Sequence, residues 1–217
     1  MKKAVIFDMD GVLSDTEWIY VDKILEFLRE KGIDIPASQI NDLFGQTMLT
    51  ICKELKSRYQ LSGDPRLFAD RIHALRDAHI KEHGIFPMEG AVTLVKALYK
   101  KGVPMAVASS APGYLIRSNM RHFGIEACFS YFVSGRDCVC GKPDPEIYLR
   151  AAELLNVSPS ECVVIEDSSN GVNAAKNAGM YCIAFVPKKA VPQDISRADR
   201  ILTSFVGLDI DSLFPGG

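Results

Sequence analysis

Two aspartates follow the first apolar segment of the chain at a spacing of two residues. Residues 4–7 are apolar, Asp8 and Asp10 come next, and Gly11 stands directly behind them. In an extended backbone, residues i and i+2 point the same way, so both carboxylates can converge on one substrate atom or one cation. Two like charges this close tend to raise one pKa, and a divalent cation would relieve the repulsion. A strand followed by an Asp-Gly turn is the non-functional interpretation, and these residues alone favour function over it only modestly.

Polar side chains also end two later apolar segments. Ser109 and Ser110 follow one of them, and Glu166 and Asp167 end the other. If these segments are parallel strands, all three polar sets emerge at one edge of the sheet, where α/β proteins bind ligands. Four carboxylates in one crevice would repel strongly, so a bound cation is nearly required. Oxygen donors without His or Cys indicate Mg²⁺ before Ca²⁺ or Zn²⁺.

A lysine in a loop stiffened by proline supplies positive charge. Lys142 lies in Gly-Lys-Pro-Asp-Pro, where Pro143 and Pro145 restrict the backbone before a helical segment. From there its ammonium could reach the acidic edge and neutralise both carboxylate and substrate charge. Without that edge, a surface lysine beside a helix start would be the default interpretation.

In chain order, these residues resemble the four motifs of the haloacid dehalogenase superfamily. The matching residues are Asp8-x-Asp10-Gly11-Val12, Ser109, Lys142-Pro143 and Glu166-Asp167. With the helical insert after the first motif, the chain is similar to the β-phosphoglucomutase-like subfamily. The resemblance implies a doubly wound core and a four-helix cap that closes over the site.

The resemblance also implies a catalytic role for each motif residue. Asp8 would attack phosphorus in line and become an aspartyl-phosphate. Asp10 would protonate the leaving oxygen and then activate water, a role that needs a pKa near neutrality. Ser109 and Ser110 would bind the phosphate, and Lys142 would offset its charge.

The implied metal site uses oxygen ligands. Mg²⁺ would be held by Asp8, the backbone carbonyl of Asp10 and Asp167, with Glu166 as a ligand or directly behind the ligands. Dehalogenases carry Tyr, and phosphonoacetaldehyde hydrolases carry Ala, at the position of Asp10. Neither residue can protonate an alkoxide, so Asp10 favours phosphoester chemistry.

Two positions in the insert separate a phosphatase from a mutase. β-Phosphoglucomutases carry a His where this chain has Tyr20, and a phosphate-gripping Arg where it has Met48. A mutase must hold both phosphates of a bisphosphate, so these departures favour a phosphatase acting on a small phosphorylated metabolite such as a sugar phosphate. Lys53, Lys56 and Arg58 could compensate, which keeps the mutase as the alternative. A non-catalytic phosphometabolite-binding module is disfavoured because the charged motif residues are all present.

The apolar pattern predicts the elements that position these residues. Strands are expected at residues 4–7, 103–108, 131–134, 162–165, 181–186 and 199–202. Helices are expected at residues 15–31, 37–44, 47–59, 65–83, 90–101, 113–123, 145–155 and 169–178. Alternating strands and helices predict a parallel sheet with helices on both faces. The expected fold is therefore α/β, with a doubly wound core of residues 1–14 and 85–217 and an all-helical cap of residues 15–84.

The insert is expected to set the substrate, because the core motifs contact only phosphate and metal. Tyr20, Gln46 and Met48 are candidates for contact with the leaving group, although core packing explains Met48 about as well. Thr16 and Gly84 lie near the two chain crossings between the domains and are candidate hinges.

Composition limits the partners of the chain. A net charge of −2 creates no general attraction to nucleic acid or anionic membranes. No apolar run approaches the roughly 18 residues of a membrane helix, and the first residues lead into a strand instead of a signal peptide. We expect a cytoplasmic monomer. The six cysteines are expected as buried, reduced thiols, and no second Cys pair or nearby His completes a metal site with Cys138 and Cys140.

Overall fold

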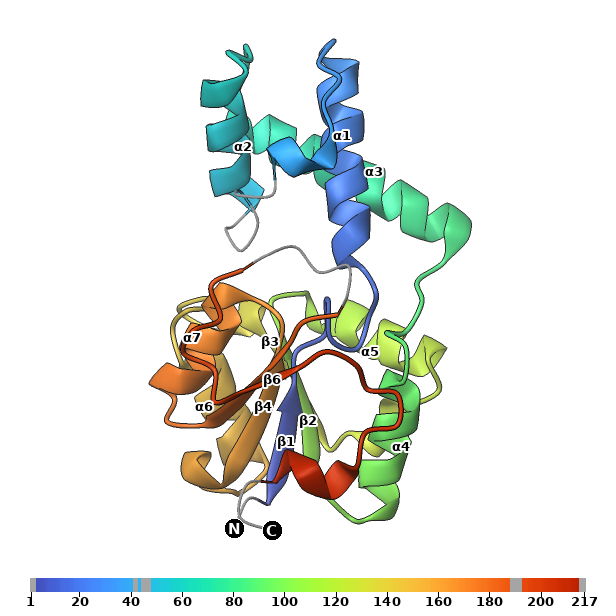
Figure 1. The fold of residues 1–217 in the computed structure, drawn as a ribbon, viewed down its shortest axis with the longest axis vertical. Helices are drawn as coiled ribbons and strands as arrows, with labels where there is room; N and C mark the ends of the chain where they lie inside the picture. The colour runs from blue at the N-terminus through green and yellow to red at the C-terminus, as the bar shows by residue number, and fades with distance from the viewer. Residues whose placement is uncertain (1–2, 41–42, 44–47, 188–192, 215–217) are drawn as a thin grey trace. The chain divides into compact units, whose positions relative to one another are not determined.

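The chain forms two compact units in the computed structural model, which describes residues 3–40, 43, 48–187 and 193–214. The α/β unit comprises Met1–Asp15, Phe86–Lys189 and Asp194–Gly217. The helical unit comprises Thr16–Ile85 and Ala190–Gln193. Figure 1 labels helices and strands of both units.

A six-stranded parallel sheet forms the centre of the α/β unit (Figure 1). Its strands are β1 (Ala4–Phe7), β2 (Met105–Ser109), β3 (Tyr131–Ser134), β4 (Cys162–Glu166), β5 (Tyr181–Phe185) and β6 (Arg200–Leu202). Their order is β3-β2-β1-β4-β5-β6, so the winding direction reverses beside β1. Phe7 at the end of β1 pairs with Val107 of β2 and Ile165 of β4, which brings these three carboxyl ends to the same edge. The predicted parallel α/β core is confirmed, with a switch point of the kind that binds ligands.

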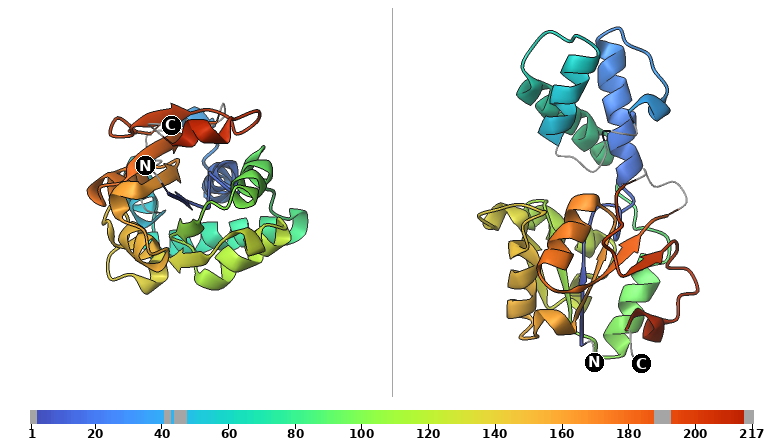
Figure 2. Two further views of the ribbon diagram at one scale, coloured as in Figure 1. Left: turned by 90° about the horizontal axis from the view of Figure 1, so that it is seen from below. Right: turned by 60° about the vertical axis from the view of Figure 1, so that its left-hand side comes forward.

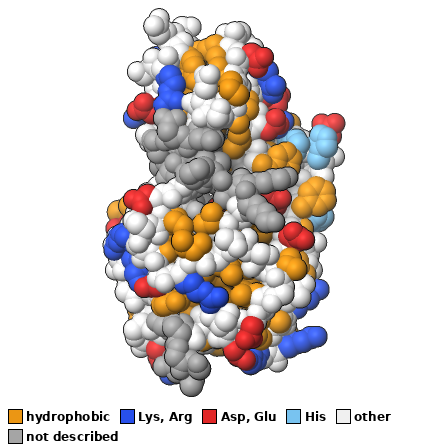
Figure 3. Space-filling model, in the orientation of Figure 1, with side chains coloured by type: hydrophobic (Ala, Val, Ile, Leu, Met, Phe, Trp, Pro, Cys, Tyr) orange, Lys and Arg blue, Asp and Glu red, His pale blue; other side chains and the backbone are white. Residues whose placement is uncertain are grey.

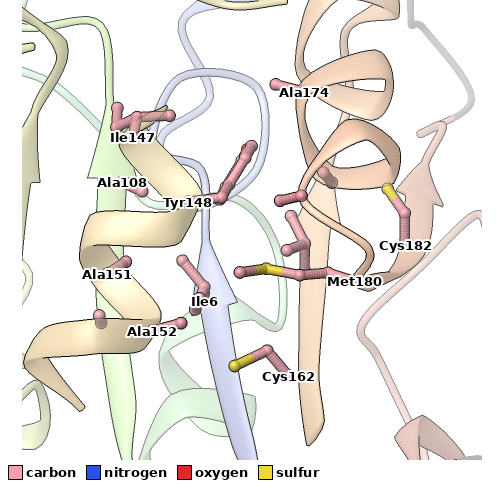
Figure 4. Close-up of a cluster of buried hydrophobic side chains, with 14 of the residues drawn as sticks. Ile6, Ala108, Ile147, Tyr148, Ala151, Ala152, Cys162, Ala174, Met180 and Cys182 are labelled. Carbon is pink, nitrogen blue, oxygen red and sulfur yellow. The ribbon is translucent and has the colours of Figure 1, made fainter. Parts of the chain in front are cut away.

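Helices cover both faces of this sheet. Helices α6 (Glu146–Leu154) and α7 (Ser169–Asn177) cover one face, and α4 (Ala91–Lys100) and α5 (Gly113–His122) cover the other (Figures 1 and 2). Every residue of β1 is fully buried, as expected for a strand covered on both faces. Figure 4 shows the apolar cluster beneath α6 and α7, in which Ile6 and Ala108 of the strands meet Tyr148 of α6. The small alanines of the strands and helices allow this close packing.

Short 3-10 helices occur in both units, η1 in the helical unit and the others in the α/β unit. They are η1 (Ala37–Gln39), η3 (Glu126–Cys128), η4 (Gly135–Asp137), η5 (Pro159–Glu161) and η6 (Ile210–Leu213). The predicted elements of the α/β unit otherwise agree with the structure to within two residues at each end.

Three α-helices make up most of the described helical unit. They are α1 (Glu17–Glu30), α2 (Met48–Arg58) and α3 (Pro65–His83). Helix α3 packs against α1 and α2 around an apolar cluster that includes Phe27, Leu55 and Ile72. The start of α3 follows its sequence signal, because Asp64 Oδ1 accepts a hydrogen bond from the amide of Arg66 at 2.9 Å. The described residues from 16 to 85 contain no strand.

The helix expected at residues 37–44 is wrong in its described part. No continuous α-helix forms among its described residues: Ala37–Gln39 is the 3-10 turn η1, Ile40 leaves helical geometry with a φ of −121°, and Leu43 is again in 3-10 geometry. The sequence continues with Asn41 and Asp42, which are weak helix formers, so apolar spacing alone overestimated this segment. The implied four-helix arrangement is therefore three α-helices within the described residues, with 3-10 geometry at Ala37–Gln39 and at Leu43 in place of the fourth.

Surface features agree only partly with expectation. The cysteines are free thiols, but Cys140 is exposed and Cys128 and Cys138 are half-buried, so the prediction that all six thiols are buried is wrong for these three. Cys140 lies in the segment between η4 and α6, outside any helix or strand. No helix among the described residues is long and apolar enough to cross a bilayer. Positive and negative side chains are interspersed on the face in Figure 3.

Candidate active site

Strand β1 delivers Asp8 to the carboxyl edge of the sheet. The Asp8 side chain is only 9% exposed, and its amide donates to the carbonyl of Ile165 in the neighbouring β4 at 3.0 Å. The chain then folds back, because the amide of Ser14 donates to the carbonyl of Met9 at 2.8 Å. This tight turn keeps Asp10 close enough for its charge to act on Asp8.

Lys142 reaches the acidic edge as its loop position suggested. Its Nζ donates to Asp8 Oδ1 at 2.5 Å, to Glu166 Oε1 at 2.7 Å and to the carbonyl of Ala108 at 3.3 Å. The lysine side chain is 7% exposed, so these contacts lie in a region shielded from water. One buried ammonium therefore joins carboxylates from the ends of β1 and β4 to the end of β2.

Neighbouring side chains brace the loop that carries Lys142. Glu146 Oε2 accepts from the amides of Val139 and Cys140 at 2.8 and 3.0 Å. Asn177 of α7 donates through Nδ2 to the carbonyl of Pro143 at 3.1 Å. The loop is thus held from both α6 and α7, which limits the positions that the Lys142 ammonium can take.

Three carboxylates at this edge could hold a cation. Asp8, Glu166 and Asp167 each offer an oxygen, and these oxygens lie within 4.8 Å of one another, the one such group found in the described part of the chain. Both oxygens of Glu166 already accept hydrogen bonds from protein groups, among them Lys142 and Ser168. The arrangement suits a hard cation bound mainly by Asp8 and Asp167, with Glu166 behind them.

Gly11 makes room for the Asp167 carboxylate. A Cβ at position 11 would lie 1.7 Å from Asp167 Oδ2, and the backbone there has a φ of +78°. A side chain at this position would therefore push the carboxylate away from the site and also strain the backbone.

We expect Gly11→Ala to weaken magnesium affinity about 10- to 100-fold, because Asp167 must move. The dependence of activity, or of the melting temperature, on Mg²⁺ concentration measures this change. Gly102→Ala is the matched control, since Gly102 has a φ of +74° but no atom within 4 Å of its added Cβ. Equal magnesium affinities in the two variants would contradict the assignment of Asp167.

Burial and the neighbouring charges shift the pKa values of Asp8 and Glu166 in opposite directions. Burial raises the pKa of Asp8 to about 7; Lys142 opposes this shift, while the charges of Glu166 and Asp10 add to it. Burial alone would also raise the pKa of Glu166, but the charge and hydrogen bond of Lys142 outweigh it and hold that pKa below its usual value. A single lysine thus keeps Glu166 ionised but does not fully offset the burial of Asp8.

In the absence of metal, we expect the contribution of Asp8 to the free energy of unfolding to fall as the pH rises from 5 to 8. Its native pKa of about 7 exceeds the ordinary value of 3.8, so the native state retains a proton that the unfolded chain has lost. Stability therefore falls with rising pH through this window. Urea unfolding in EDTA measures the free energy of unfolding of wild type and of Asp8→Asn. The difference between the two values should change by about 2–3 kcal/mol across this pH range. Parallel pH profiles for the two proteins would refute this assignment.

The two predicted serines take different positions. Ser109 ends β2, is 1% exposed, and accepts the amide of Ala111 through Oγ at 3.1 Å. Ser110 is exposed. Among the described hydrogen bonds, neither serine contacts the acidic cluster.

Two residues at the site were missed by sequence reasoning. The hydroxyl of Tyr148 donates to Glu166 Oε1 at 3.1 Å, and a Cβ at Gly171 would lie 1.6 Å from the same oxygen. A glycine inside the helix expected at 169–178 was a usable signal of close approach. Tyr148 had no such signal, because a tyrosine on the apolar face of a helix reads as core.

A parallel sheet with a buried lysine and clustered carboxylates at its switch point is typical of α/β enzymes that act on anionic substrates. The chain belongs to the haloacid dehalogenase-like hydrolase family, whose sequence profile matches residues 5–185. The resemblance drawn from the motifs is thereby confirmed.

Two relatives agree with this assignment, and a solved structure agrees with the fold. The chain is 29% identical to the bifunctional riboflavin kinase/FMN phosphatase of Arabidopsis thaliana over 97% of its own length and 55% of the other, so it spans about half of that protein. It is 33% identical to the phosphorylated carbohydrates phosphatase of Thermotoga maritima, over 82% of each chain. Its fold matches that of β-phosphoglucomutase from Clostridium difficile with a TM-score of 0.75, at 24% identity over 98% of this chain and 96% of that one.

Proposed function

We propose that this chain is a Mg²⁺-dependent phosphatase that hydrolyses a small phosphorylated metabolite, a sugar phosphate in particular, through an aspartyl-phosphate on Asp8. The observation that carries the proposal is the contact of Lys142 with both Asp8 and Glu166 beside Asp167, at the carboxyl edge of the sheet. The phosphatase names of relatives such as the Thermotoga enzyme support the reaction class.

In the first half of the reaction, the Asp8 carboxylate attacks phosphorus in line. The bond from phosphorus to the ester oxygen breaks as the bond to Asp8 forms, and Asp10 gives its proton to the leaving alkoxide. Lys142 and Ser109 stabilise the negative charge of the phosphoryl oxygens. Ser110 is assigned a supporting place in phosphate binding.

In the second half, Asp10 acts as a base. It takes a proton from the water that attacks the phosphoryl group, which releases phosphate and restores the Asp8 carboxylate. Mg²⁺, held by Asp8, the carbonyl of Asp10 and Asp167, would neutralise charge on the phosphoryl oxygens. Glu166 keeps Lys142 in place instead of binding the ion.

The helical unit would act as the cap that selects the leaving group. Tyr20 remains a candidate contact; its ring lies 6.0 Å from the His73 ring and 5.0 Å from the Arg76 guanidinium. Met48 packs on the apolar cluster of the unit, which favours its core interpretation, and Gln46 lies outside the described residues. The hinge roles of Thr16 and Gly84, at the unit boundaries, stay predictions.

A phosphosugar mutase is the alternative that the motif resemblance leaves open, although the match to β-phosphoglucomutase at 24% identity concerns the fold alone. The basic residues that could replace the missing arginine are partly engaged elsewhere. Lys56 Nζ donates to the carbonyl of Gly63, and Arg58 donates to that of Gln39, both at 2.7 Å. These local contacts favour the phosphatase over the mutase.

A panel of phosphorylated metabolites with Mg²⁺ tests the proposal. We expect release of free phosphate from a subset of sugar phosphates and its loss in EDTA. β-Glucose 1-phosphate with a trace of its bisphosphate separates the alternative, because glucose 6-phosphate without free phosphate would identify a mutase. No turnover of any ester would favour the non-catalytic binding module. Cytoplasmic location and a monomeric state stay predictions.

A further inference from the structure

Tyr148 places a phenol against the charged cluster from inside the apolar core. The residue is fully buried on α6, and Figure 4 shows it among the aliphatic side chains beneath this helix. Its hydroxyl donates to Glu166 Oε1 at 3.1 Å, and its ring centroid lies 4.9 Å from Lys142 Nζ. The same side chain therefore touches both partners of the Lys142–Glu166 ion pair.

The hydrogen bonds of Glu166 come from three directions. Oε2 accepts from the amide and the hydroxyl of Ser168, at 2.7 and 3.0 Å. Oε1 accepts from Lys142 and from Tyr148. Ser168 holds the carboxylate from the segment directly after Glu166, whereas Tyr148 holds it from α6.

The hydroxyl is an unusual group at such a position. A buried phenol costs free energy unless its oxygen finds a partner, and phenylalanine would fill the same space without that requirement. The volume of the core thus explains the ring of Tyr148 but not its oxygen. The oxygen is explained by its bond to Glu166 and, through Glu166, by the position of Lys142.

We propose that Tyr148 is a positioning residue, which holds Glu166 so that Lys142 stays in contact with Asp8. This inference rests on the proposed function only for its kinetic consequences. The aromatic face adds a second contribution, because a buried ammonium is stabilised above a ring.

Tyr148→Phe removes the hydroxyl and keeps the ring. We expect kcat to fall about tenfold with KM changed less than about twofold, because the loss falls on the stabilisation of charge during phosphoryl transfer. Tyr114→Phe is the matched control, since Tyr114 is 77% exposed. A Tyr148→Phe enzyme with the kcat of the control would overturn the proposal.

A double-mutant cycle separates positioning from general packing. If Tyr148 acts through Glu166, Tyr148→Phe should lower kcat less than about twofold in a Glu166→Gln background. A repeated tenfold loss there would show that the hydroxyl does not act through Glu166.

A structural test remains informative even if no phosphate ester is turned over. In a crystal structure of Tyr148→Phe, we expect Glu166 to rotate and the contact between Lys142 Nζ and Asp8 Oδ1 to lengthen beyond hydrogen-bond distance. An unchanged Lys142–Asp8 contact would refute the positioning role. An inactive wild-type protein would instead count against the proposed phosphatase.

Discussion

Asp8→Asn is expected to lower phosphate release by at least about 10⁴-fold, whichever ester the chain hydrolyses. An amide oxygen is a far weaker nucleophile than a carboxylate, and it cannot form the aspartyl-phosphate. The fold should survive, because Lys142 keeps its contact with Glu166 at 2.7 Å and no buried charge loses its only partner. Steady-state kcat and circular dichroism measure the two outcomes.

The control for Asp8→Asn is the same change at an exposed site. Asp211 pairs with Lys101 and its side chain is 69% exposed, so Asp211→Asn should leave kcat within about twofold. Rapid quenching with labelled substrate should trap a phosphorylated wild-type protein and none of the Asp8→Asn variant. Turnover of the variant at the wild-type rate would remove Asp8 from the role of nucleophile.

Lys142→Met is expected to have the largest effect on stability, about 3–5 kcal/mol in the absence of metal. The methionine fills similar volume but leaves Asp8 and Glu166 buried near one another without a cation. Urea unfolding in EDTA measures the loss. Activity should also disappear, because the charge that offsets the phosphate is gone.

Two comparisons test whether charge is the cause of this loss. Lys101→Met removes a lysine whose side chain is 45% exposed, and it should cost less than about 1 kcal/mol. Adding Glu166→Gln to Lys142→Met should restore part of the stability, because one of the two uncompensated charges is removed. Equal losses for Lys142→Met and Lys101→Met would mean that the buried pairing contributes little.

Motif order and strand pattern were enough to predict the acidic edge. Asp8, Ser109 and Glu166 each stand at the end of an apolar segment. In a parallel sheet all such ends share one edge, so their meeting follows from topology without any knowledge of side-chain packing. The predicted segment at 37–44 was less secure, because apolar spacing there was not supported by strong helix formers.

The role of Glu166 could not be decided from its position in the sequence. As a carboxylate beside Asp167, it was equally consistent with binding the metal or standing behind it. Hydrogen bonds from Lys142, Tyr148 and Ser168 occupy both of its oxygens and favour the second role. Contacts of this kind join residues as far as 24 positions apart, and local patterns do not encode them.

The sequence by itself determined the family, the parallel α/β core and the set of charged residues available for chemistry, because each depends on residue type and chain order. The tertiary structure alone decided which of these charged residues contact one another. It placed Lys142 between Asp8 and Glu166, gave Asp167 the space left by Gly11, and set the Tyr148 hydroxyl on Glu166. Those arrangements depend on the distances between buried side chains of different elements, which only the packed fold defines.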